Sequence, residues 1–165
     1  MKIDASIALL DMKPIDLVQN KKEKADLLYL RGKTLEYLPE FSKVAEENLS
    51  KAIKLMPSKH EAWDALGHVY WKKGDLLNSK KSFETSLELN DKNKETLCKL
   101  SMVIRQVQEE NPEKRRENFE QSIKFAGMAV TLDMTDSQTW CTYLNLCKLI
   151  SYRYPWERTF DQLFC

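Results

Sequence analysis

Glycine and proline are scarce in this chain of 165 residues, which contains 4 glycines and 5 prolines. Because a fold of many short strands needs frequent turn residues, this shortage favours helices over a turn-rich β structure. The four cysteines, at positions 98, 141, 147 and 165, are unevenly spaced and form no Cys-x-x-Cys pair. They therefore indicate reduced thiols in a cytosolic or nuclear protein rather than a disulfide framework or a metal site.

The sequence also lacks a charge excess and a long apolar run. Its formal net charge is +1, so a one-signed surface for direct DNA binding is not expected. No stretch approaches the length of a membrane-spanning helix, and residues 1–11 lack the cationic start and apolar run of a secretory signal. Hydrophobic residues make up 42% of the chain, which is enough for a globular core. We therefore expect a folded protein without a membrane partner.

Signatures of catalysis are missing as well. The two histidines, His60 and His68, lie roughly 12 Å apart if one helix carries both. The sequence contains no H-E-x-x-H, G-x-S-x-G or phosphate-loop pattern. We predict that the protein is not an enzyme and that it uses no catalytic residue, no metal and no cofactor.

The most informative stretch runs over residues 60–93. Trp63, Leu66, Gly67 and Tyr70 follow the order W-x2-L-G-x2-Y, which is the first-helix signature of the tetratricopeptide repeat (TPR). The three large side chains lie on one face of a helix and are expected to bury together. Gly67 lets a partner helix approach closely, which explains a glycine in a helix interior. The stretch has 34 residues, the period of this repeat class.

A second helix should follow the first after a short break. Gly74-Asp75 supplies a helix-ending glycine and a helix-capping aspartate, and Phe83 lies on the apolar face of the next helix. The predicted fold is therefore all-α, a right-handed superhelix of antiparallel helix pairs. The residues expected to form the repeat core are Trp63, Leu66, Gly67, Tyr70, Phe83 and Trp140.

Weaker repeats flank the strong one. The third repeat has some nine residues more than the period, from longer helices or a longer loop, and Ser101 takes the position of its small residue. The predicted organisation is capping helices over 1–24, a degenerate repeat over 25–59, the strong repeat over 60–93, a repeat with an insertion over 94–136, the first helix of a fourth repeat over 137–150, and an atypical tail over 151–165.

The aromatic-rich tail does not have the form of a second repeat helix. Because a repeat cannot bury its apolar face alone, natural arrays end in a polar cap. We therefore expect a truncated product, a splice or gene-model variant, or a tail that folds back as a cap.

The first helices of such an array line a concave groove, and the side chains opposite the core face point into it. Trp71 is interpreted as a peptide anchor, although it can instead pack on the neighbouring repeat. Arg105 is the preferred carboxylate ligand because a guanidinium binds a carboxylate with two hydrogen bonds; the alternative is a salt bridge within the array. The first repeat contributes three residues to this groove: Tyr29, Lys33 and Glu36. The main candidates for the groove are Asp64, His68, Trp71, Lys72, Lys99, Met102, Arg105, Gln106 and Asn145.

Two short stretches indicate a particular family within the TPR class: YWKKGD, residues 70–75, and LSMVIRQ, residues 100–106. Over about residues 26–147 the chain resembles the Strap-type stress-response cofactors, a family within the TPR class. The resemblance implies a protein-interaction adaptor with transcription cofactors as partners. It also implies recognition of the amino-terminal peptide of nascent tubulin at the ribosome, which underlies tubulin autoregulation. Family members carry further repeats and a C-terminal oligonucleotide-binding-like barrel, and functions that need those parts are not expected here.

Two alternatives to the peptide-binding adaptor stay open at this point. The first is a ribosome- or RNA-associated scaffold that uses the local basic pairs Lys72-Lys73, Lys80-Lys81 and Arg115-Arg116. The second is an inactive truncated fragment.

Overall fold

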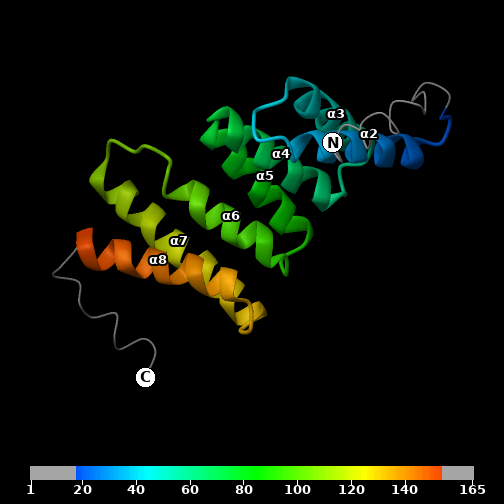
Figure 1. Cartoon of the computed structure of the whole chain (residues 1–165). Coiled ribbons are helices and arrows are strands. Elements are labelled where there is room, and N and C mark those ends of the chain that lie inside the picture. Colours follow the sequence, from blue (N-terminus) through cyan, green and yellow to red (C-terminus); the bar gives the residue numbers. More distant parts are fainter. Residues whose placement is uncertain (1–17, 154–165) are drawn as a thin grey trace. The chain divides into compact units, whose positions relative to one another are not determined.

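In the computed structural model, residues 18–153 are described, and their regular structure is helical (Figure 1). The fold class predicted from the sequence is confirmed: helices follow one another in pairs, without a strand in this range. The helices are α2 Lys21–Glu36, α3 Lys43–Leu55, α4 His60–Lys73, α5 Leu76–Leu89, α6 Lys94–Ile104, α7 Pro112–Leu132 and α8 Ser137–Arg153.

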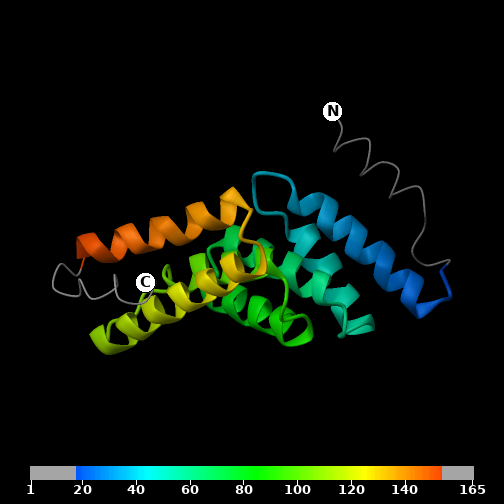
Figure 2. The same cartoon turned by 90° about the horizontal axis from the view of Figure 1, so that it is seen from below.

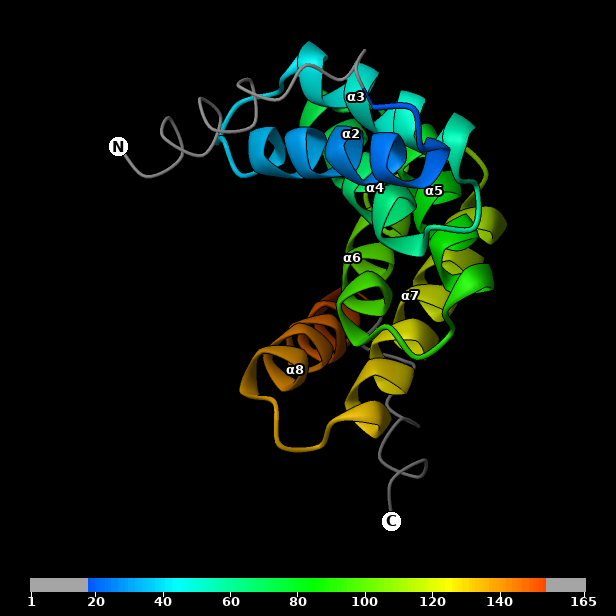
Figure 3. The same cartoon turned by 90° about the vertical axis from the view of Figure 1, so that its right-hand side faces the viewer.

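The helices belong to two compact units, divided between Lys92 and Asn93. In the first unit α2 packs on α3, α4 packs on α5, and α3 also contacts α4. In the second unit α7 packs on both α6 and α8, and these two helices also contact each other. Figures 2 and 3 show the two helices of each pair lying side by side within their unit. No helix of the described part of the chain is long and apolar enough to span a membrane.

The break between α4 and α5 has the chemistry that its sequence requires. Gly74 adopts a left-handed conformation with φ 84°, which disfavours any residue with a Cβ. Its N–H donates to the Trp71 carbonyl at 3.0 Å and so ends α4. Asp75 then accepts a hydrogen bond from the Asn78 N–H at 3.2 Å and begins α5. The turn therefore reverses the chain in two residues.

The α4–α5 pair is held by a close approach at Gly67. The ring of Phe83, which is fully buried, lies against this glycine, so that a Cβ there would be only 2.8 Å from the ring. Beside it, the Ser79 hydroxyl donates to the Gly67 carbonyl at 2.8 Å. Trp63 and Tyr70 pack, partly buried, against the core that includes Leu66.

The α6–α7 pair repeats the same hydrogen bond and shows where the extra residues lie. The Ser122 hydroxyl donates to the Ser101 carbonyl at 2.7 Å, as Ser79 does to Gly67. Ser101 therefore takes the position of Gly67 in this pair. The connection of residues 105–111 replaces a two-residue turn, and α7 has 21 residues where α5 has 14, while α6 is shorter, with 11 residues where α4 has 14.

A second recurring bond fixes the register of α8. The Trp63 indole N–H donates to the Pro57 carbonyl, and the Trp140 N–H to the Met134 carbonyl, both at 2.8 Å. In each case the acceptor lies six residues before the tryptophan, so α8 begins as α4 does. The sequence predicts Trp140 as a core residue. In the structure 37% of its surface is exposed, so it lies at the edge of the core rather than inside it.

The predicted domain boundaries are not all within the described range. α2 begins at Lys21, four residues before the predicted start of the first repeat. Residues 1–17 of the predicted cap and 154–165 of the predicted tail lie outside the described residues. The boundaries themselves stay predictions.

A lysine and two aspartates join the start of α6 to the connection between α7 and α8. Lys94 Nζ lies 2.6 Å from Asp133 Oδ2 and 3.0 Å from Asp136 Oδ2. Asp133 also accepts hydrogen bonds from the hydroxyl and the N–H of Thr135. These bonds, that of Lys94 above all, lower the pKa of Asp133 to about 2. The cluster therefore favours the ionised carboxylate in the folded state.

This geometry predicts an acid-dependent contribution to stability. The pKa of Asp133 is lower in the folded chain than its ordinary value of 3.8, so the contribution is complete above about pH 4 and disappears as the pH falls through about 2. We expect Lys94→Met to raise the pKa of Asp133, as measured by NMR titration of its carboxyl carbon. Lys92→Met removes an exposed lysine outside the cluster and should leave that pKa unchanged. An equal response to both variants would contradict the assignment.

Candidate peptide-binding face

Three of the predicted groove residues lie close to Glu36 at the end of α2: Lys33, His68 and Lys72. Glu36 is only 6% exposed, and its carboxylate oxygens lie 2.6 Å from His68 Nδ1 on α4 and 2.7 Å from Lys33 Nζ. Burial raises the pKa of Glu36, but the hydrogen bonds from His68 and Lys33 outweigh burial and lower it below its ordinary value. Burial lowers the pKa of Lys33, yet its bond to Glu36 more than offsets this and raises it. An ionised carboxylate thus joins α2 to α4.

Lys72 supports the same junction. Its Nζ donates to the main-chain carbonyls of Glu36 and Leu38, the second at 2.7 Å. Cations are favourable at a helix C-terminus because the last carbonyls there have no partner within the helix. His68 and Lys72 are therefore engaged within the protein, and they position α4 against α2 rather than projecting toward a ligand.

The other candidates of the first unit differ in exposure. Asp64 is only 7% exposed and offers little surface to a peptide. Trp71 is half-buried, and its ring makes an edge contact with the His68 ring, with 6.0 Å between centroids. The network around Glu36 thus fixes one side of the indole. Trp71 remains the part of this face that can contact an apolar side chain.

In the second unit the candidates lie on α6, just after it, and on α8. Arg105 ends α6 and is half-buried, and its Nη1 atom is buried without a hydrogen-bond partner among the described residues. Burial lowers the pKa of Arg105. Met102 is half-buried, whereas Gln106 and Asn145 are exposed. Lys99 Nζ lies 3.9 Å from the Glu95 carboxylate on its own helix.

Arg105 is therefore the most unusual cation of the described chain. The alternative interpretation of Arg105 is a salt bridge within the array. Arg105 forms no such ion pair among residues 18–153. A desolvated guanidinium with an unsatisfied donor is energetically unfavourable, and a carboxylate from a ligand would satisfy it. No group of three His, Cys, Asp or Glu side chains in the described part of the chain is arranged to hold a metal ion.

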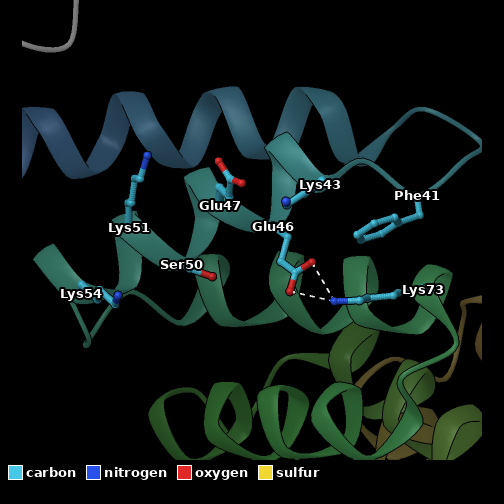
Figure 4. A pocket seen from close by; sticks show the side chains of 8 residues that line it. All are labelled: Phe41, Lys43, Glu46, Glu47, Ser50, Lys51, Lys54 and Lys73. Atoms are coloured by element: carbon cyan, nitrogen blue, oxygen red, sulfur yellow. Dashed lines mark hydrogen bonds and ion pairs between the residues drawn. The ribbon is translucent and has the colours of Figure 1, made fainter.

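The sequence analysis did not identify a further surface, a hollow on the outer side of α3. It is lined by residues of α3, by Phe41 just before that helix, and by Lys73 at the end of α4 (Figure 4). The repeat signature describes first helices and core positions, so it gives no signal for exposed positions of a second helix.

Comparison with known proteins identifies the class. The tetratricopeptide repeat model matches residues 60–93. Solved structures with the same fold include the TPR domain of Arabidopsis OM64, with a TM-score of 0.67 at 11% identity, covering 79% of this chain and all of that domain. MamA has a TM-score of 0.53 at 18% identity and covers 93% of this chain and 90% of its own. The chain therefore has the tetratricopeptide-repeat fold, and residues 60–93 match the repeat itself.

Within this class, the chain is similar to tetratricopeptide repeat protein 5. The human protein is 40% identical over 135 residues, which is 79% of this chain and 30% of the relative. The cattle protein is 40% identical over 125 residues, with 76% and 28% covered. The chain thus spans about 30% of the length of the curated relatives it matches. The fold and these relatives support a protein-interaction adaptor.

Proposed function

We propose that this chain is a non-enzymatic adaptor that binds an extended peptide through a carboxylate held by Arg105. The observation that carries the proposal is the buried Nη1 atom of Arg105, which has no hydrogen-bond partner in the described residues. A peptide carboxylate would supply the missing acceptor and could bind the planar guanidinium with two bonds. Met102 lies three residues before Arg105 and offers an apolar contact, and Gln106 follows Arg105 directly and offers an amide contact.

Trp71 is proposed as a separate apolar anchor in the first unit. Aromatic side chains that are partly exposed and held in a fixed orientation are effective anchors, because little conformational entropy is lost on binding. The Glu36–His68 bond and the ring contact of His68 with Trp71 provide this orientation. Lys99 and Asn145 are proposed as secondary contacts.

The identity of the peptide is proposed from the similarity to tetratricopeptide repeat protein 5. We infer an acidic or amino-terminal peptide, such as that of nascent tubulin at the ribosome, and a second role with transcription cofactors in the stress response. Such roles would place the protein in the cytoplasm and the nucleus. The adaptor is favoured over an RNA scaffold because the basic pairs are largely engaged. Lys73 pairs with Glu46, Lys80 with Glu84, and Arg116 with Glu120.

The test is a fluorescence anisotropy titration with a labelled amino-terminal peptide of tubulin. We expect Arg105→Glu to weaken binding by more than tenfold. The substitution removes the guanidinium that donates to the peptide carboxylate and puts a negative charge in its place, which repels that carboxylate. Arg105→Lys should recover only part of the affinity, since an ammonium cannot form the paired bonds.

Arg116→Glu is the matched control. It introduces the same charge change at an exposed position of α7 and should alter the affinity little. Binding that is insensitive to Arg105→Glu, or equally sensitive to both variants, would contradict the carboxylate site. In a separate titration, the unlabelled peptide is added while the intrinsic tryptophan emission is followed. Quenching that is lost in Trp71→Ala would support the apolar anchor.

A further inference from the structure

The hollow beside α3 belongs to the first unit, whereas Arg105 belongs to the second. The hollow is open and has a volume of about 440 Å³. Figure 4 shows its side chains along the exposed side of α3, with Phe41 and Lys73 at one end and Lys51 and Lys54 toward the other. Its lining is dominated by lysine.

The carboxylates of the hollow do not balance these lysines. Lys73 Nζ lies 3.0 and 3.1 Å from the two carboxylate oxygens of Glu46, so these two charges cancel. Only Glu47 then opposes the three other lysines of the hollow, Lys43, Lys51 and Lys54. These three are exposed and make no ion pair or hydrogen bond with the part of the chain that the structure describes. The surface therefore has a local positive excess on a chain of net charge +1.

One end of the hollow is apolar. The Phe41 ring is 37% exposed, and Lys73 Nζ lies 5.4 Å from its centroid. The Glu46–Lys73 pair therefore holds the ammonium beside the ring by a cation–π contact. The outer face of the ring stays available to an apolar side chain.

We propose that this hollow binds an acidic peptide segment that carries an aromatic or aliphatic residue at one end. The acidic side chains pair with Lys43, Lys51 and Lys54, and the apolar residue packs on Phe41. α3 has 13 residues and is roughly 20 Å long, which an extended segment of about six residues would span. A peptide fits better than a nucleic acid, because the positive excess is confined to this hollow and the whole chain has a net charge of only +1.

The experiment uses the full chain and a fluorescein-labelled peptide of one phenylalanine followed by a run of glutamates. We expect saturable binding that weakens about tenfold when Lys51→Glu and Lys54→Glu are combined, and several-fold in Phe41→Ala. All three positions are exposed, so the fold should be retained, which circular dichroism checks. The titrations are repeated in the Arg105→Glu background, in which the proposed adaptor site cannot hold a carboxylate. Binding that persists there and is weakened by the hollow variants separates the two sites.

The matched control combines Lys81→Glu and Lys124→Glu, two exposed lysines on α5 and α7 that lie outside the hollow. It changes the net charge by the same amount and should leave the affinity within about twofold. Equal weakening by both double variants would overturn the proposal in favour of unspecific attraction. A labelled single-stranded RNA that binds more tightly, and that loses affinity in the same hollow variants, would overturn it in favour of a nucleic-acid surface. Absence of peptide binding by the folded wild type would also overturn it.

Discussion

Phe83→Ala is expected to lower the free energy of unfolding by about 3–5 kcal/mol, the largest stability effect that we predict. Phe83 is fully buried, and its ring fills the space that Gly67 leaves between α4 and α5. Alanine would lose the transfer free energy of the ring and would leave a cavity. Collapse into this cavity is opposed by the Ser79 and Ser86 hydroxyls, which bond the main chain of α4 on the same interface.

Urea denaturation followed by far-ultraviolet circular dichroism measures this effect. Leu77→Ala is the matched control, because Leu77 lies on the same helix and is 62% exposed. It should change the free energy of unfolding by no more than about 0.5 kcal/mol. If the two variants differed by less than about 1 kcal/mol, the packing of the Phe83 ring against α4 would be contradicted.

Gly67→Ala and Gly127→Ala are expected to change stability in opposite directions. In both helices alanine gains about 1 kcal/mol of helix propensity over glycine. At Gly67 a Cβ would lie 2.8 Å from the ring of the fully buried Phe83, and such overpacking costs about 1–3 kcal/mol. At Gly127 a Cβ would meet only the Tyr143 ring, at an ordinary 3.8 Å. The first variant should therefore destabilise the chain, and the second should stabilise it by about 0.5–1 kcal/mol.

A double-mutant cycle identifies the cause. Phe83→Leu shortens the side chain that opposes Gly67, so the combination with Gly67→Ala should lose less free energy of unfolding than the sum of the two single changes. The free energies are again taken from urea denaturation. Additive losses would show that the ring is not the group that makes alanine unfavourable at this position. Destabilisation by Gly127→Ala would contradict the contrast between the two helices.

The helical pairs and their internal packing follow from local patterns in the sequence. The period of 34 residues, the Gly74-Asp75 turn and the spacing of Trp63, Leu66 and Tyr70 are local patterns. They depend on helix geometry, in which residues three and four apart share a face, and that geometry is the same in every helix. The assignment of Ser101 to the position of Gly67 also follows from spacing, and the Ser122 hydrogen bond agrees with it.

Which of the candidate side chains are engaged within the protein depends on the tertiary structure. Sequence spacing placed His68, Lys72 and Arg105 on one kind of helix face, but it could not distinguish engaged side chains from an unsatisfied one. Glu36 and His68 are 32 residues apart, and their contact depends on how α2 and α4 pack. The same packing brings Lys72 to the end of α2, whereas Nη1 of Arg105 is buried without a partner among the described residues. Long polar side chains reach across helices in several rotamers, so their partners are selected by packing and not by period.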